Sequence, residues 1–280
     1  MNIEKSMIIA QRILEKSSTK FSQLDIEILM SKAIVKDRKY IILNLDKEIS
    51  KKNLDYFNKL VLERARGKQI AQIIKKKDFW KYEFRISNDV LIPRPDTEIM
   101  IEQVLKISKH RSKLNLLDVG VGSGCILLTL LKEREDFIGT GIDISNKSIT
   151  NTRINADLLG VKSRLRLIKS DIDNFNMGKY DIILSNPPYI SKYEINCLEK
   201  DILNFEPRIA LDGGLDGTSE IRKVIDKTSK LIKKNGKFVL EIAYNQKNKV
   251  IDLLKNKGFY INKIIKDYAK NDRCVVSTKI

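Results

Sequence analysis

The chain has 280 residues, 42% of them hydrophobic, which is enough for about two domains with apolar cores. Its apolar runs fall short of the roughly 20 residues that cross a bilayer, and its first residues lack the pattern of a signal peptide, so we expect a cytoplasmic protein. The three cysteines are far apart and predict neither a disulfide framework nor a metal cluster: they are Cys125, Cys197 and Cys274.

The formal net charge of +17 suits a phosphate-rich partner, such as RNA or a ribosome-bound factor. The same charge is expected of any protein from a lysine-rich proteome. The lysines are scattered, and Lys75-Lys76-Lys77 is the longest run. Charge alone therefore does not establish nucleic-acid binding.

Residues 1–75 are predicted to form a small helical domain. Apolar residues recur at helical spacing from Ile8 to Leu14 and again from Leu24 to Ala33. Another helix is expected from Asn53 to Arg66, because the Gly67 that follows is a suitable C-terminal glycine.

Residues 76–95 are predicted to be a β-hairpin that links two domains. The segment from Phe79 to Ile86 alternates large and charged side chains, as a strand does. Asn88-Asp89 is a turn signal, and Val90 to Ile92 fits the returning strand.

Strands and helices alternate over residues 96–280, which predicts a Rossmann-like α/β domain with a parallel, doubly wound sheet. Seven strands are expected, at 114–119, 137–142, 165–168, 180–184, 238–242, 260–265 and 274–278. Helices are expected at 97–108, after the glycines at 120–124, and at 146–159, 220–233 and 246–257. The last two strands have no helix between them, so we expect the final strand to run antiparallel at the sheet edge.

A glycine-rich turn joins the first of these strands to the helix that follows. It reads Gly120-Val121-Gly122-Ser123-Gly124 and is preceded by Asp118. Glycines allow the backbone to approach a ligand closely, and the helix N-terminus favours negative charge. The spacing is G-x-G-x-G, with Cys125 where a dinucleotide-binding G-x-G-x-x-G turn has its last glycine. A nicotinamide or flavin cofactor is therefore disfavoured.

Acidic residues follow three successive strands. Asp118 precedes the glycines, Asp143 suits the hydroxyls of a ribose, and Asp171 suits an adenine amine, with Ile172 beside it. Such acids line the carboxyl edge of a doubly wound sheet, where ligands bind. This pattern favours S-adenosylmethionine, which has a ribose and a carboxylate but no pyrophosphate.

The fourth strand runs into Asn186-Pro187-Pro188-Tyr189. An amide nitrogen is a poor nucleophile because its lone pair is delocalised, and the exocyclic amine of adenine shares this problem. The Asn186 side-chain oxygen and the Pro187 carbonyl can accept the two N–H groups and turn the lone pair toward a methyl donor. The two prolines stiffen the loop, and the Tyr189 ring can pack on the planar substrate group. Glutamine and adenine both remain open as substrates, and no metal or general base is required.

These segments together resemble the bacterial peptide-chain release factor glutamine N5-methyltransferases, the HemK/PrmC family, over nearly the whole chain. The resemblance is carried by Leu91–Glu98 (LIPRPDTE), Asn186–Ile190 (NPPYI), Phe205–Gly214 (FEPRIALDGG) and Asp267–Arg273. It implies a class I S-adenosylmethionine-dependent methyltransferase domain. It also implies that the substrate is the glutamine of the Gly-Gly-Gln motif in class-I release factors, and that residues 1–75 contact the release factor. We expect a monomer that does not require nucleic acid.

The chain departs from the family pattern at four positions. Val121 stands where threonine is usual, Gln69 and Lys75 stand where proline and glycine are usual, and Ile172 stands where a larger side chain is often found. These changes could weaken cofactor binding, but they leave the Asn-Pro-Pro-Tyr segment intact.

Two alternatives remain. The Asn-Pro-Pro-Tyr motif and the positive charge also suit an adenine-N6 methyltransferase acting on DNA or RNA. That activity needs base flipping and target recognition, and the sequence has no large insertion for a recognition domain. The other alternative is a protein that binds a translation factor without catalysis, which the intact motif disfavours.

Overall fold

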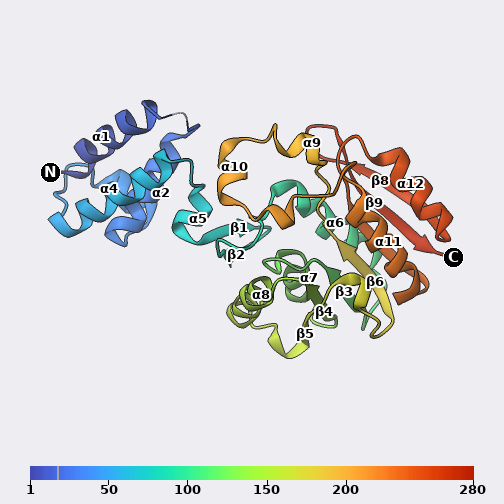
Figure 1. Ribbon diagram of the computed structural model, residues 1–280. Coiled ribbons are helices and arrows are strands. Elements are labelled where there is room, and N and C mark those ends of the chain that lie inside the picture. The colour runs from blue at the N-terminus through green and yellow to red at the C-terminus, as the bar shows by residue number, and fades with distance from the viewer. Residues whose placement is uncertain (18) are drawn as a thin grey trace. The chain divides into compact units, whose positions relative to one another are not determined.

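The computed structural model describes residues 1–17 and 19–280. Contacts divide the chain into two compact units. One unit comprises Met1–Lys76 and Glu199–Phe205, and the other comprises Lys77–Leu198 and Glu206–Ile280. Figure 1 draws the N-terminal helices in blue and the sheet with its helices from green to red.

The first unit is helical. Its helices are α1 (Ile3–Glu15), α2 (Gln23–Ile34), α3 (Arg38–Leu43), α4 (Lys51–Ala65), α5 (Ile70–Ile74) and α10 (Lys200–Phe205). Asn2, Ser22, Asp37 and Ser50 cap the first four, each side chain accepting a backbone N–H of the first turn. Leu14, Leu29 and Phe57 are among the residues of its buried core. In the described part of the chain, no helix has the length and apolar character needed to cross a membrane.

Helix α10 joins this unit although it belongs to the long segment after the fourth strand of the sheet. Arg64 of α4 is only 7% exposed, and it donates to Asp25 Oδ2 at 3.0 Å and to Asp201 Oδ2 at 3.2 Å. Gln72 donates to the carbonyl oxygen of Phe205. A buried guanidinium requires carboxylate partners, so Arg64 fixes α10 against the helical unit. The sequence predicted only a loop here.

The predicted hairpin is present but shorter and earlier than expected. It consists of β1 (Lys76–Phe79) and β2 (Tyr82–Arg85), so the turn lies at Trp80-Lys81 rather than at Asn88-Asp89. The expected strand at Val90–Ile92 does not form. The side chains of Asn151 and Asn155, in the helix Asn146–Leu159, pair with the backbone of Arg85 and Ser87 and thus occupy groups that a further strand would use.

The second unit contains the predicted seven-stranded sheet, in the order β5-β4-β3-β6-β7-β9-β8. The strands are β3 (Asn115–Val119), β4 (Ile138–Asp143), β5 (Leu165–Lys169), β6 (Tyr180–Ser185), β7 (Ile232–Glu241), β8 (Phe259–Lys266) and β9 (Asp272–Lys279). The first five pair in parallel, and β9 runs antiparallel between β7 and β8. The predicted fold class is therefore confirmed. Strand β7 starts earlier than expected, and a bulge in its pairing with β6 lies between Tyr180 and Ile182.

Helices cover both faces of this sheet. They are α6 (Glu98–Ile107), α7 (Cys125–Glu133), α8 (Asn146–Leu159), α11 (Ser219–Leu231) and α12 (Lys247–Asn256), with the short α9 (Lys192–Ile195) in the segment after β6. Helix α7 contacts α6 and α8, whereas α11 contacts α12. Val224 of α11 and Val250 of α12 share a buried core with Leu117, Ile183 and Phe238, one residue from each of three neighbouring strands.

The order of the strands positions a binding crevice. Strands β4 and β5 follow β3 on one side of it, whereas β6 lies on its other side. The chain therefore leaves the carboxyl ends of β3 and β6 in opposite directions, and open α/β sheets bind their ligands at such a switch point. Val119 ends β3 and Ser185 ends β6, with the two paired side by side.

Candidate active site

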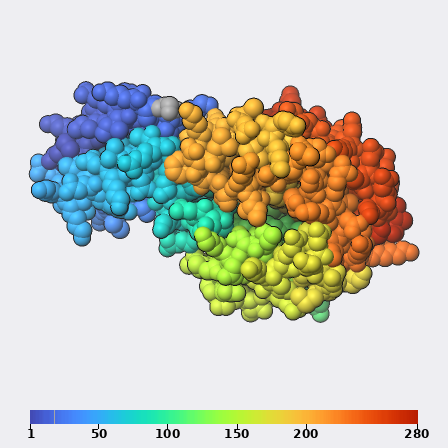
Figure 2. Space-filling model, in the orientation of Figure 1, coloured from blue at the N-terminus to red at the C-terminus, as the bar shows by residue number. Residues whose placement is uncertain are grey.

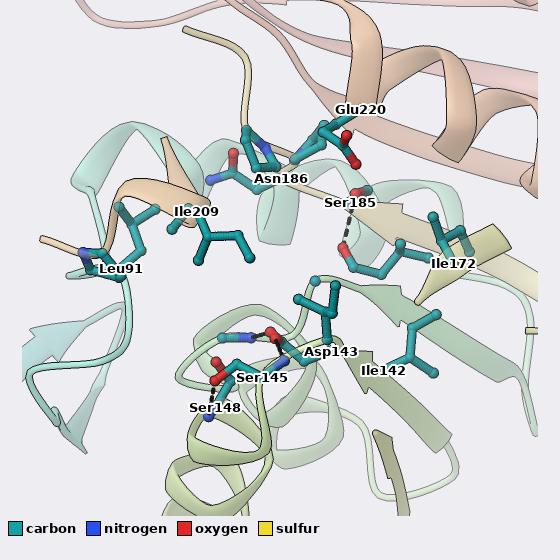
Figure 3. Close-up of a pocket in the computed structure, with 18 of the residues that line it drawn as sticks. Leu91, Ile142, Asp143, Ser145, Ser148, Ile172, Ser185, Asn186, Ile209 and Glu220 are labelled. Atoms are coloured by element: carbon teal, nitrogen blue, oxygen red, sulfur yellow. Dashed lines mark hydrogen bonds between the residues drawn. The ribbon is translucent and has the colours of Figure 1, made fainter. Parts of the chain in front are cut away.

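A cavity of about 640 Å³ lies at this switch point, lined by residues that follow β3, β4, β5 and β6. Figure 3 shows Asp143 and Ser145 on one side of it and Asn186 across from them, with Ile209 and Leu91 along a third side. In Figure 2, the green to yellow surface around residues 140–175 faces the orange surface that follows residue 206 across this cavity.

The cavity brings together most of the residues singled out in the sequence. Its lining includes Gly120, Gly122, Asp143, Asp171, Ile172, Asn186, Pro187 and Pro188. The predicted site residues Val121, Ser123, Gly124 and Tyr189 do not belong to the lining.

The glycine turn is held by the neighbouring strand β4. The N–H groups of Gly120 and Val121 both donate to the carbonyl of Ile142 at 2.9 Å, and the N–H of Gly122 donates to Asp143 Oδ2 at 2.9 Å. Gly120 has a φ of +78°, and a Cβ built there would meet no atom within 4 Å. Glycine is thus required at this position by the backbone conformation, and it leaves the backbone open toward the cavity.

The other residues of the turn pack against neighbouring parts of the chain and do not line the cavity. Val121 is buried and packs where a side chain on Gly141 would lie. Ser123 is buried, and its hydroxyl accepts the N–H of Cys125 at 3.4 Å. A Cβ on Gly124 would come within 2.7 Å of Leu128. Because Val121 points away from the cavity, the valine removes no hydroxyl from its lining in this structure.

Two acidic residues lie near each other at this end of the sheet, and of the two Asp143 lines the cavity. Asp118 is 1% exposed, and its carboxyl group lies next to the backbone N–H of Leu127, which lowers its pKa. Burial raises the pKa of Asp118 to about 7, and the charge of Asp143 adds to this effect. Burial also raises the pKa of Asp143, while the N–H groups of Ser145 and Gly122 lower it. A cationic ligand group next to Asp143 would stabilise the charged form of both carboxyl groups and so offset the effect of their burial.

Asp171 and Ile172 line another part of the cavity. Asp171 caps a short 3₁₀ helix, Ile172–Asn174, by accepting the N–H of Asp173 at 3.0 Å. Ile172 is buried and presents an apolar wall together with Ile142 and Val224. The combination of a carboxylate and an aliphatic wall suits a flat ring that carries an amine.

The Asn-Pro-Pro-Tyr segment follows β6 directly. Asn186 Nδ2 donates to Thr97 Oγ1 at 3.3 Å, and Tyr189 donates its hydroxyl to Glu241 Oε1 at 3.2 Å. The Tyr189 carbonyl accepts from Gln246 Nε2 at 2.9 Å. The ring of Tyr189 packs against the buried core rather than lining the cavity. The hydrogen bonds of Tyr189 anchor the loop, and contact of its ring with the substrate stays a prediction.

Glu241 is the residue that the sequence interpretation missed. It ends β7, is 2% exposed, accepts the hydroxyl of Tyr189 at 3.2 Å, and lies against the side chain of Thr97. Burial raises the pKa of Glu241 to about 7, although the Thr97 hydrogen bond and the charge of Arg273 lower it. The signal was available, because Glu241 is an acidic residue at a strand end, like Asp118 and Asp143. Thr97 lay unassigned within the LIPRPDTE segment.

The segment after Phe205 forms one wall of the cavity through Pro207, Arg208, Ile209, Ala210, Asp212 and Gly214. It is tied to the Asn-Pro-Pro-Tyr segment by two backbone hydrogen bonds, from Ile190 N to Leu211 O at 3.1 Å and from Gly213 N to Ile190 O at 2.8 Å. The wall and the reactive segment are thus one connected structure.

Comparison with known proteins identifies the class first. Residues 109–276 match the family described as a methyltransferase domain, which covers more than half of the chain, and residues 8–74 match the PrmC N-terminal domain. Among solved structures, a ribosomal protein L11 methylase from Lactobacillus delbrueckii subsp. bulgaricus has the same fold, with a TM-score of 0.53 at 18% identity over 73% of this chain and 90% of that one. The protein is a Rossmann-like methyltransferase.

Relatives that match over nearly their full length identify the family within this class. Release factor glutamine methyltransferases from Caulobacter vibrioides, Clostridium acetobutylicum and Buchnera aphidicola subsp. Acyrthosiphon pisum are 32%, 34% and 36% identical to it. Each comparison covers 100% of this chain and 97–99% of the relative. The chain belongs to the release factor glutamine methyltransferase family, which confirms the resemblance drawn from its motifs.

Proposed function

We propose that this protein transfers a methyl group from S-adenosylmethionine to the side-chain amide nitrogen (N5) of a glutamine, in the Gly-Gly-Gln motif of class-I peptide chain release factors. One observation carries the proposal: Asn186, Pro187 and Pro188 line the cavity of a chain that belongs throughout its length to this family. Methylation of release factors would support translation termination. A cytoplasmic location follows from this role, because release factors act on ribosomes.

The cavity residues fit S-adenosylmethionine. The half-buried Asp143, a carboxylate in the cavity lining, suits a ligand that carries an ammonium and a sulfonium group. Asp143 also offers an acceptor to ribose hydroxyls, while Asp171 and Ile172 suit the adenine ring. Gly120 allows the ligand to approach the backbone. When bound, the cofactor supplies an electrophilic methyl group on a positively charged sulfur.

The reactive segment activates the amide by orientation. Asn186 Oδ1 and the Pro187 carbonyl each accept one N–H of the substrate amide, which draws the nitrogen lone pair out of conjugation and toward the methyl donor. The prolines hold these acceptors in place and reduce the entropy lost on binding. Tyr189, bound to Glu241, keeps the loop in position. The amide nitrogen gains the methyl group as the bond from that methyl to sulfur breaks, which leaves S-adenosylhomocysteine, and the nitrogen loses one proton to solvent. Catalysis is then a matter of placement and preorganised dipoles.

We also propose that residues 1–75 recognise the release factor. Nearly all of this segment matches the PrmC N-terminal domain, and α10 packs with it through Arg64 and Asp201. We also propose that the protein acts as a monomer, because the residues assigned to the cofactor and to the substrate belong to the same chain.

A labelled-methyl experiment separates this function from its alternatives. Purified protein is incubated with cofactor labelled in the methyl group and with either a class-I release factor or a mixture of DNA and RNA. We expect label in the release factor only. Label in nucleic acid only would establish an adenine methyltransferase instead, and no transfer despite release-factor binding would indicate a binding protein without catalysis.

A further inference from the structure

We propose that Thr97 and Glu241 form a positioning relay that turns the oxygen of the Asn186 amide, rather than its nitrogen, toward the substrate. This inference rests on the proposed function only in naming the substrate, since the relay itself is a property of the chain. An asparagine amide can occupy either of two orientations related by a flip. Only one of them presents an acceptor to a substrate N–H, so the reaction requires a device that selects it.

The contacts around Thr97 provide this selection. Thr97 is 2% exposed, and its oxygen accepts from Asn186 Nδ2 at 3.3 Å. Its hydroxyl also lies against the Glu241 carboxyl group and lowers the pKa of that group. A carboxylate can only accept, whereas a hydroxyl has a single proton to donate. When Glu241 is ionised, the Thr97 proton points to Glu241 and a lone pair points to Asn186. The Asn186 NH₂ group must then face Thr97, which leaves its oxygen for the substrate.

Protonation of Glu241 removes the selection. A carboxylic acid can donate to Thr97, and the Thr97 proton is then free to turn toward Asn186. The Asn186 amide can then adopt the flipped orientation, in which its NH₂ group faces the N–H groups of the substrate. Two donors cannot form a hydrogen bond, so the acceptor for the substrate is lost. The substitution Glu241→Gln should remove the selection of the Asn186 orientation at every pH, because the glutamine amide can also donate to Thr97.

The groups around Glu241 determine the pH at which Glu241 loses its proton. Arg273 and Cys274 face it from β9, Asp96 from the turn before α6, Tyr189 from the loop after β6, and Cys125 from α7. Burial raises the pKa of Glu241 to about 7, with Arg273 opposing and Asp96 adding to the shift. Arg273 is itself neutralised by Asp267 at 3.0 Å. Ionised Glu241 is the competent form, so kcat should rise with pH through this range.

The enzymatic test compares Glu241→Gln and Thr97→Val with the conservative Thr97→Ser. We expect the first two to lower kcat about tenfold, the cost of one misdirected hydrogen bond, without changing the KM for the cofactor. Thr97→Ser should recover most of the rate, because serine keeps the hydroxyl. The wild-type kcat should fall on the acid side of pH 7, and Glu241→Gln should lose this limb. Glu135→Gln and Thr150→Val, at exposed positions, are matched controls.

A second readout needs no substrate. The side-chain ¹⁵N–¹H₂ resonances of Asn186, assigned by their loss in Asn186→Ala, should shift with a midpoint near pH 7 in the wild type and stay fixed in Glu241→Gln and Thr97→Val. Resonances that titrate equally in all three proteins, or kcat values of both variants within twofold of the wild type, would overturn the relay. If the resonances behave as expected but no release factor is methylated, the proposed function fails while the relay stands.

Discussion

Replacing Asn186 by alanine is expected to lower kcat for release-factor methylation by about 10²–10³-fold, the usual cost of losing one preorganised hydrogen-bonding group that acts in the transition state. The alanine side chain cannot accept the substrate N–H, so the nitrogen lone pair stays delocalised. The dissociation constant of the cofactor should change little, because Asn186 follows β6 whereas the glycine turn and Asp143 belong to β3 and β4. Single-turnover kinetics and calorimetry measure the two quantities separately.

Asn256→Ala is the matched control for this prediction. Asn256 ends α12 and is exposed, so the same substitution there should leave both quantities unchanged. Unchanged turnover in Asn186→Ala would rule out the mechanism. A large loss of cofactor affinity with normal turnover at saturation would assign Asn186 to the cofactor instead.

Asp143→Ala should act in the opposite way, raising the dissociation constant of S-adenosylmethionine about 10- to 100-fold while changing kcat at saturating cofactor much less. The carboxylate accepts the N–H of Gly122 at 2.9 Å and the N–H of Ser145 at 2.8 Å. Its removal takes an acceptor from the ribose and also releases the glycine turn, and hydrogen bonds to a charged group are worth about 1.5–3 kcal/mol each. Isothermal titration calorimetry and saturation kinetics check the two parts.

Two comparison variants sharpen this test. Asp143→Asn retains one acceptor and should fall between alanine and the wild type. Asp252→Ala removes an exposed carboxylate from α12 and should bind the cofactor normally, which accounts for any general effect of net charge. Cofactor affinity equal to the wild type in Asp143→Ala would contradict the assignment of this carboxylate.

The sheet and the glycine turn could be predicted because their signals are local. Alternating strands and helices dictate a doubly wound sheet, and acids at strand ends meet at one edge whatever their distance in sequence. Asp143 and Asp171 therefore reached the cavity as expected. The Asn-Pro-Pro-Tyr segment was placed by the same logic, since it follows a buried strand directly.

The remaining features depend on contacts that no local pattern encodes. Thr97 and Asn186 are 89 positions apart. Only the folded chain shows that they contact each other and that Glu241 lies next to Thr97. Tyr189 is predicted to contact the substrate because an aromatic ring can stack there, and only the folded chain shows that its hydroxyl also binds Glu241. Helix α10 could not be assigned to the helical unit because its partner Arg64 is 137 positions away from Asp201.

The hairpin error has a different origin. Val90 and Ile92 are almost fully buried and have β-forming side chains, so their pattern resembles a strand. Asparagine side chains of α8 instead satisfy the backbone at Arg85 and Ser87, and Pro93 and Pro95 provide no N–H for a ladder. Burial in this stretch therefore comes from packing without strand pairing.

The central claim is that the chain methylates the amide nitrogen of one glutamine, and mass spectrometry of the modified release factor tests it most directly. Unmethylated release factor is treated with cofactor and either wild-type protein or Asn186→Ala, digested, and fragmented to locate the added mass. We predict a single methyl group on the glutamine side chain of the Gly-Gly-Gln peptide with the wild type and none with the variant. A methyl group on another residue, or an unmodified Gly-Gly-Gln peptide with active wild-type protein, would contradict the proposed function.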